Sequence, residues 1–135
     1  MTNERDGTIT VIDTATDKVV STLKVGGRPR GIRISNNKDR IWVAITSPSN
    51  ESQGEDKIVE LDPKGKVVAQ YDAGTDPENF VLDDAVTRLY IANEDAGTAS
   101  ITDVKANRVI ATMPVGPNKV IGTVKAGNGP WGIAL

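Results

Sequence analysis

The residues that could bind a ligand lie in repeated turn segments of the chain. They offer two guanidinium groups, Arg28 and Arg30, two carboxylates, Asp76 and Glu78, and the amide of Asn79. Guanidinium groups hold anions through charge-assisted hydrogen bonds, whereas carboxylates hold hard cations such as Ca²⁺. The same residues could instead form hydrogen bonds with backbone groups in turns. This interpretation is supported by their spacing, which matches no known ligand-binding loop. Both readings stay open.

Three further candidates lie later in the chain. Glu94 and Asp95 are the carboxylates that could bind a metal ion, and Trp131 occupies the same repeat position as Arg30. We expect Arg30, Glu78 and Trp131 to line any site together. No residue is assigned a catalytic role.

The sequence has no cysteine and no histidine. Serine and cysteine triads, hydrolysis at a histidine-bound zinc and haem ligation through histidine are therefore excluded. We predict no cofactor. Enzymatic acid-base chemistry would need two of the carboxylates Asp76, Glu78, Glu94 and Asp95.

The overall charge gives little sign of a macromolecular partner. The sequence contains sixteen Lys and Arg residues and eighteen Asp and Glu residues, and only five of its side chains are aromatic. Neither a basic surface nor an aromatic stacking platform for nucleic acid is visible. No apolar stretch is long enough to span a membrane, and the polar N-terminus has no signal-peptide pattern.

The elements that must position these residues are short β-strands. Val and Ile supply 27 residues against five Leu, and apolar residues alternate in short runs bounded by Gly, Pro, Asn and Asp. This pattern indicates strands, since β-branched side chains pack well on a pleated surface. Asp13, Asp62 and Asp103 each follow a predicted strand, and we interpret them as side chains that begin turns.

An internal repeat organises these strands. Residues 3–13 align without a gap on residues 93–103, and residues 40–44 align on 88–92. The middle copy carries a seven-residue insertion within the polar stretch 47–55. Each full copy supplies four strands over about 40–45 residues, which is typical of a β-propeller blade.

We therefore predict an all-β fold built from β-propeller blades of four antiparallel strands, with about three blade equivalents in a single domain, 1–135. The predicted units are these: a composite blade beginning with 1–27, blades at 28–74 and 75–116, a spare strand at 117–127 and a closing first strand at 128–135. The spare strand repeats a fourth strand after only eleven residues, as an internal deletion of blades would.

Several segments of the repeat carry a family resemblance. They are Val11-Ile12-Asp13-Thr14-Ala15-Thr16, Lys18-Val19-Val20, Arg28-Pro29-Arg30-Gly31-Ile32 and Leu89-Tyr90-Ile91-Ala92-Asn93. These segments resemble the repeat of the YVTN β-propeller proteins. The resemblance implies a periplasmic or secreted bacterial protein, and related propellers include lactonases. It carries no catalytic motif that could be transferred.

Three functions remain open. We favour a non-enzymatic binding or scaffold module whose ligand or protein partner lies at the central mouth. The alternatives are a lactonase- or lyase-like enzyme with a carboxylate-bound metal, and an inactive truncated or engineered fragment. Because propellers close with four to eight blades, we also predict a homo-oligomer, with a dimer favoured, formed by blade-to-blade packing.

Overall fold

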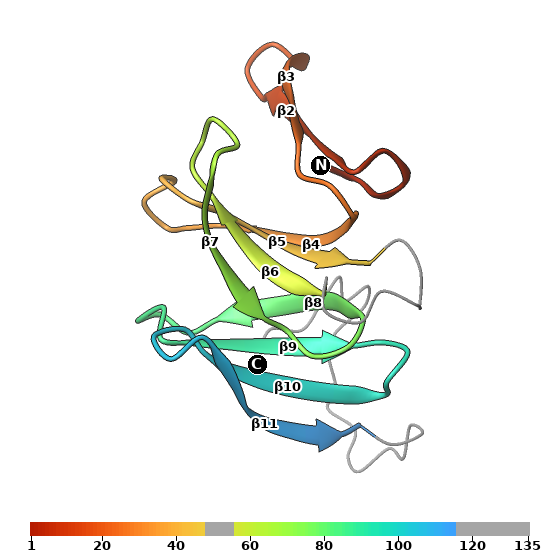
Figure 1. The fold of residues 1–135 in the computed structure, drawn as a ribbon. Helices are drawn as coiled ribbons and strands as arrows, with labels where there is room; N and C mark the ends of the chain where they lie inside the picture. The colour runs from red at the N-terminus through yellow and green to blue at the C-terminus, as the bar shows by residue number, and fades with distance from the viewer. Residues whose placement is uncertain (48–55, 116–135) are drawn as a thin grey trace, which may run out of the picture.

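The structure is a computed structural model that describes residues 1–47 and 56–115, and it consists of three successive antiparallel sheets (Figure 1). The first sheet contains β1 (Thr2–Asn3), β2 (Thr8–Asp13) and β3 (Lys18–Lys24). The second contains β4 (Arg28–Ile34), β5 (Ile41–Thr46), β6 (Lys57–Leu61) and β7 (Val67–Asp72). The third contains β8 (Pro77–Leu82), β9 (Arg88–Asn93), β10 (Thr98–Asp103) and β11 (Arg108–Pro114).

The predicted fold class is confirmed. Strands follow one another antiparallel in the order of the chain within every sheet, as in propeller blades. A three-residue 3-10 helix, Glu4–Asp6, joins β1 to β2. None of the helices among the described residues has the length and hydropathy needed to cross a bilayer. The predicted units 117–127 and 128–135 lie outside the described residues.

The strands end where the sequence analysis places turns. Asp13 Oδ1 accepts hydrogen bonds from the backbone N–H groups of Ala15 and Thr16, both at 2.9 Å. Asp62 Oδ1 accepts equivalent bonds from Lys64 and Lys66, also at 2.9 Å. The predicted role of these aspartates in turns is confirmed, because each carboxylate holds the backbone that reverses the chain.

The middle strands of the second sheet, β5 and β6, are buried on both faces. Successive residues of β5 point to opposite sides, so Val43 and Ile45 pack toward Ile9 of the first sheet, while Trp42 and Ala44 pack toward the third. This explains why β5 reads as an unbroken apolar run. The inner strands β4 and β8 lie in contact, which brings the second and third sheets together.

Trp42 and Tyr90 share a strand position, and the sequence predicts that both pack between blades. Trp42 does so: it is 3% exposed and stacks on Tyr71 with ring centroids 5.2 Å apart. For Tyr90 it stays a prediction, because no further described sheet lies beyond it and its side chain is 39% exposed. Tyr90 lies on the face of the third sheet directed away from the second, and no other described strand covers that face.

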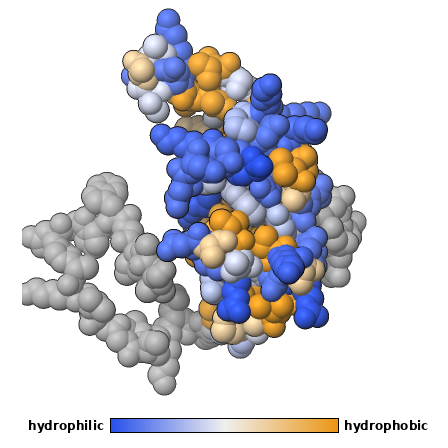
Figure 2. All heavy atoms as spheres, turned by 90° about the vertical axis from the view of Figure 1, so that its left-hand side faces the viewer, coloured by the Kyte–Doolittle hydropathy of each residue, from blue (hydrophilic) through white to orange (hydrophobic). Residues whose placement is uncertain are grey.

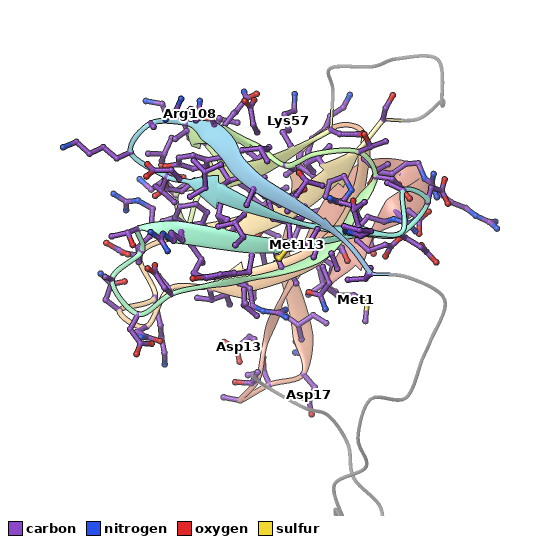
Figure 3. The ribbon with its side chains drawn as sticks, turned by 90° about the horizontal axis from the view of Figure 1, so that it is seen from below. Met1, Asp13, Asp17, Lys57, Arg108 and Met113 are labelled. Atoms are coloured by element: carbon purple, nitrogen blue, oxygen red, sulfur yellow. The ribbon has the colours of Figure 1, made fainter. Side chains whose placement is uncertain are left out.

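The two ends of the blades differ in their connections. The β4–β5 and β8–β9 turns lie at the left of Figure 1, and the β9–β10 connection lies at the right. The β2–β3 hairpin, marked by Asp13 and Asp17, projects from the body of the molecule (Figure 3).

Candidate functional site

The inner strands place two predicted residues against each other. Arg30 on β4 and Glu78 on β8 occupy the same repeat position, and their side chains form an ion pair. The strands approach closely because β4 has a glycine here: a Cβ on Gly31 would lie 2.8 Å from the Glu78 carbonyl oxygen. Any larger residue would force the two blades apart.

Arg30 is the centre of a charged cluster, which we call the mouth cluster: Glu4, Arg28, Arg30, Asp76, Glu78 and Glu94. Besides Glu78, its guanidinium lies 3.0 Å from Glu4 Oε2 and 3.7 Å from Glu94 Oε2. Only 16% of the Arg30 side chain is exposed. The buried Nε of Arg30 has no hydrogen-bond partner within the part of the chain that the structure describes. One cation thus joins segments from all three sheets.

Arg28 and Glu4 form the outer part of the cluster. Arg28 Nε donates to Glu4 Oε1 at 3.0 Å. This hydrogen bond lowers the pKa of Glu4 and raises the pKa of Arg28. Glu4 is therefore held ionised, and both arginines already have carboxylate partners.

Asp76, Glu78 and Glu94 bring carboxylate oxygens within 4.8 Å of one another. Asp76 is buried, Glu78 is half-buried and Glu94 is exposed. Burial, and then the hydrogen bond with Glu94, raises the pKa of Glu78 in spite of the neighbouring Arg30. Glu78 therefore retains its proton more strongly than a free glutamate, and it forms a carboxyl pair with the neighbouring Glu94.

The backbone around Asp76 is fixed by a second carboxylate. Asp76 has a left-handed conformation with φ of 55°, and its N–H donates to Asp56 Oδ2 at 2.8 Å. The other oxygen of Asp56 accepts from the Ser47 N–H at 2.8 Å. The Glu94 N–H donates to the Asp76 carbonyl at 3.1 Å. The loops that carry the acidic residues are thus tied to one another.

The structure brings five of the predicted residues into the mouth cluster: Arg28, Arg30, Asp76, Glu78 and Glu94. Asn79 is directed elsewhere, because its Oδ1 accepts from Arg33 Nη2 at 3.0 Å. Asp95 takes part through its backbone N–H, which donates to Asp76 Oδ2 at 3.3 Å, and its carboxylate is not in the acidic group. Trp131 lies outside the described residues.

Sequence reasoning missed Glu4 and Asp56. The internal repeat contained the signal for Glu4, since the alignment of 3–13 on 93–103 places Glu4 over Glu94. Asp56 had no such signal. Its role depends on the distance between two loops that are far apart in the sequence.

No family model and no curated protein matches this chain. Solved structures do match. Hydrazine synthase from Kuenenia stuttgartiensis has a TM-score of 0.65 at 14% identity, over 82% of this chain and 30% of that one. A candidate 6-phosphogluconolactonase from Bacteroides fragilis has 0.63 at 17%, over 84% and 35%. The periplasmic gluconolactonase PpgL of Pseudomonas aeruginosa has 0.61 at 16%, also over 84% and 35%.

These likenesses show the fold alone. The chain spans about a third of the length of each of these structures. Its successive antiparallel sheets correspond to part of a propeller, and the specific resemblance to the YVTN repeat stays a prediction.

Proposed function

We propose that the chain is a β-propeller binding module whose ligand site is the mouth cluster. The observation that carries this proposal is the position of Arg30, whose guanidinium pairs with Glu4, Glu78 and Glu94 from three separate segments. A binding site at the mouth of a propeller is built in this way, from side chains of several blades. The predicted role of Arg28, Arg30, Asp76 and Glu78 belongs to this proposal.

The charge of the cluster favours a cationic ligand over an anion. Four carboxylates face two guanidinium groups, and both of these are already paired with carboxylates. An anion would have to displace Glu4 or Glu78. A hard divalent cation would add positive charge and so balance the excess of carboxylates in the cluster.

Ca²⁺ fits the acidic group of the cluster. Oxygens bound to one Ca²⁺ lie at about 2.3–2.6 Å from it, so two of them are at most about 5 Å apart. The oxygens of Asp76, Glu78 and Glu94 meet this limit. Binding would release the proton that Glu78 retains more strongly than a free glutamate does.

Isothermal titration with Ca²⁺ at pH 5 and pH 7.5 tests this proposal. We expect tighter binding at pH 7.5, proton release at pH 5, and at least a tenfold loss of affinity in Glu78→Gln. Asp95→Asn is the matched control, since this neighbouring carboxylate is outside the acidic group. Equal affinity in Glu78→Gln, or no binding at millimolar Ca²⁺, would exclude the ion as the ligand.

A lactonase is the second candidate, supported by the gluconolactonases among the structural matches and by the carboxyl pair. Glu94 would accept a proton from water as the water oxygen attacks the lactone carbonyl. Glu78 would donate its proton to the ring oxygen as the carbon–oxygen bond breaks, which leaves a hydroxy acid. Hydrolysis of D-glucono-1,5-lactone followed by pH-stat tests it: both Glu78→Gln and Glu94→Gln must lose the activity. An unchanged rate in either variant would exclude this mechanism.

We further propose that two copies of the chain associate through blade faces. The outer face of the third sheet exposes Val81, Tyr90 and Met113. Another copy would cover these residues in the way that the third sheet covers Trp42. Light scattering after size exclusion should give the mass of a dimer for the 135-residue chain, and Tyr90→Lys should convert it to a monomer. A monodisperse, folded wild-type monomer would contradict the proposal.

Export to the periplasm or medium is part of the same proposal. It is supported by the resemblance to the YVTN repeat and by the periplasmic location in the name of one structural match. Fractionation of the cells that naturally produce the chain tests it, and recovery from the cytoplasm alone would contradict it.

A further inference from the structure

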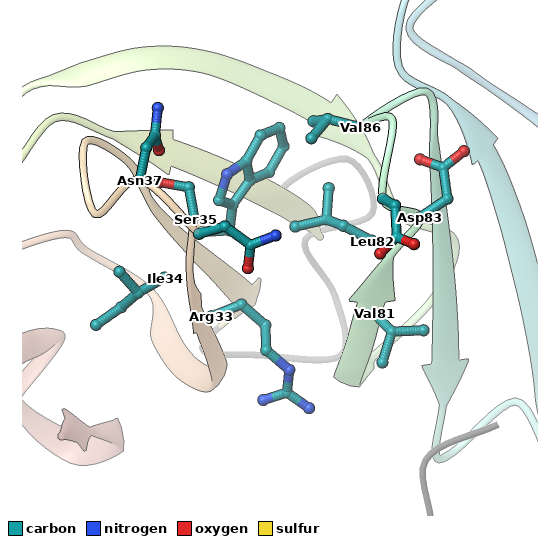
Figure 4. Close-up of a pocket in the computed structure, with 11 residues that line it drawn as sticks. Arg33, Ile34, Ser35, Asn37, Val81, Leu82, Asp83 and Val86 are labelled. Carbon is teal, nitrogen blue, oxygen red and sulfur yellow. The ribbon is translucent and has the colours of Figure 1, made fainter.

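A cavity lies between the β4–β5 and β8–β9 hairpins, at the opposite end of the inner strands from the mouth cluster. Its volume is about 420 Å³, which is within the range of small-molecule sites. Arg33 reaches it from one hairpin, and Leu82, Asp83 and Val86 reach it from the other (Figure 4). The surrounding face of the molecule is mainly hydrophilic, with separate hydrophobic patches (Figure 2). The mouth cluster contributes no residue to this cavity.

Trp42 supplies an unused hydrogen-bond donor to the wall of this cavity. Its side chain is 97% buried, and its ring stacks on Tyr71. Within residues 1–47 and 56–115 the indole N–H makes no hydrogen bond, and it is not among the buried atoms without a partner, so it is open to the cavity or solvent. A ligand in the cavity that presents an oxygen would satisfy this donor.

The charged residues of the cavity divide into engaged and available groups. Asp83 is engaged, since its Oδ1 accepts from the backbone N–H groups of Thr87 and Arg88 at 2.6 and 3.0 Å. Asp84 is exposed and forms no ion pair with any described residue. Arg33 donates to the Ile32 carbonyl and to Asn79, which uses two of its five N–H groups. One carboxylate and one guanidinium therefore remain available to a ligand.

The apolar part of the wall includes a strained residue. Val86 has φ of 54°, a left-handed conformation that is unfavourable for a β-branched side chain. Lys38 at the same position of the β4–β5 turn has φ of 60°, so the turn geometry demands this conformation. Placing valine there adds an apolar branched side chain beside Leu82 and Trp42 at a cost in conformational energy.

We propose that this cavity binds a small apolar zwitterion, an amino acid with an aromatic or large aliphatic side chain. Its carboxylate accepts from the Trp42 N–H and the Arg33 guanidinium, and its ammonium group pairs with Asp84. Its side chain packs on Leu82 and Val86. Each available charged group of the cavity then has a partner of opposite charge, and Leu82 and Val86 are covered.

Three probes of the same shape test the proposal by isothermal titration with the full 135-residue chain. L-phenylalanine carries both charges, 2-phenylethylamine carries only the ammonium group, and 3-phenylpropionate carries only the carboxylate. We expect L-phenylalanine to bind at least tenfold more tightly than either of the others. Equal binding of one single-charge probe would overturn the zwitterion as the ligand class.

Two variants assign the contacts. Asp84→Asn should lower the affinity for L-phenylalanine and 2-phenylethylamine about tenfold and leave the affinity for 3-phenylpropionate unchanged. Trp42→Phe keeps an aromatic ring and should lower the affinity for L-phenylalanine and 3-phenylpropionate, the two probes that carry a carboxylate, but not for 2-phenylethylamine. If Trp42→Phe unfolds, Asp84→Asn with the three probes still decides, because Asp84 is exposed. Asp95→Asn, whose carboxylate belongs neither to the cavity lining nor to the acidic group, is the control and should bind all three probes as the wild type does; a change there would contradict the assigned contacts.

Discussion

The first and third sheets have similar sequences and the same local hydrogen bonds, but different surroundings. Asn3 Nδ2 donates to the hydroxyls of Thr8 and Thr10 at 3.0 and 2.8 Å. At the equivalent place, Asn93 Nδ2 donates to Thr98 and Ser100 at 3.2 and 2.7 Å. Adjacent strands are thus joined in the same way in both copies.

The difference lies in what covers these networks. Asn93 is 2% exposed, and the β7–β8 connection at Gly74 lies against its side chain, whereas Asn3 is only half-buried. Nearly every residue of β3 is exposed, and the tip of the β2–β3 hairpin, at Asp13 and Asp17, projects away from the other sheets (Figure 3). The two copies of the repeat therefore share a local structure, but the same hydrogen bonds contribute differently to the free energy of unfolding. A polar network contributes most where a neighbouring blade excludes water from it.

Two equivalent glycines give the largest expected contrast. Gly74 has φ of 90°, and a Cβ there would lie 2.8 Å from both Asn93 Nδ2 and Ser100 Oγ. Gly26, 48 positions earlier, has φ of 76° and no atom within 4 Å of such a Cβ. Gly74→Ala should cost about 3 kcal/mol through backbone strain and overpacking, and Gly26→Ala about 1 kcal/mol through strain alone. Urea unfolding measures the loss of free energy of unfolding in each variant. Equal losses would show that Asn93 and Ser100 move away from the added methyl group at little cost.

Removing the asparagines tests the networks themselves. Asn93→Ala should lower the free energy of unfolding by about 2 kcal/mol, since it leaves the buried Ser100 hydroxyl without its donor. Asn3→Ala should cost less than about 1 kcal/mol, because water can reach Thr8 and Thr10. Urea unfolding of the single and double variants gives the two values. A larger loss in Asn3→Ala would reverse the assignment of the better-protected sheet.

Glu4 and Glu78 should give opposite pH dependences. The pKa of Glu4 is lowered, chiefly by Arg28, so Glu4 stabilises the fold above the unfolded value of 4.5 and this contribution is lost as pH falls through its folded pKa. The pKa of Glu78 is raised, chiefly by burial, so its contribution is present below pH 4.5 and lost as pH rises through its folded pKa.

Glutamine variants measure this difference through the melting temperature. At pH 7, Glu78→Gln should melt above the wild type, and Glu4→Gln below it. The difference for Glu78→Gln should vanish below about pH 4, where the wild-type carboxyl is protonated as well. A lower melting temperature of Glu78→Gln at pH 7 would mean that its ion pair with Arg30 outweighs its burial.

The smallest effect is expected in the β8–β9 turn. Val86→Asn should stabilise the fold by about 0.5–1 kcal/mol, because asparagine tolerates the left-handed conformation that valine resists. Lys38→Asn is the matched control in the β4–β5 turn and should gain less, since lysine is not β-branched. Thermal unfolding compares them. An equal gain in stability in the two variants would show that side-chain branching is not the source of the strain at Val86.

The sequence by itself determined the strands, their grouping and the main charged residues of the mouth. Period-two alternation and the turn-forming aspartates are local properties, so β2, β6 and β10 end at or just before Asp13, Asp62 and Asp103, where the sequence predicts turns. The repeat register also placed Arg30 and Glu78 at equivalent positions of neighbouring inner strands. Such positions meet wherever two blades pack side by side.

Only the tertiary structure decided which side chains meet and how deeply they are buried. It joined Glu4 to Arg28, turned Asn79 toward Arg33, and buried Trp42 while leaving the equivalent Tyr90 exposed. It also raised the pKa of Glu78 through burial beside Glu94. These outcomes depend on the neighbouring blade, and a repeat carries the same local sequence whether or not a neighbour covers it.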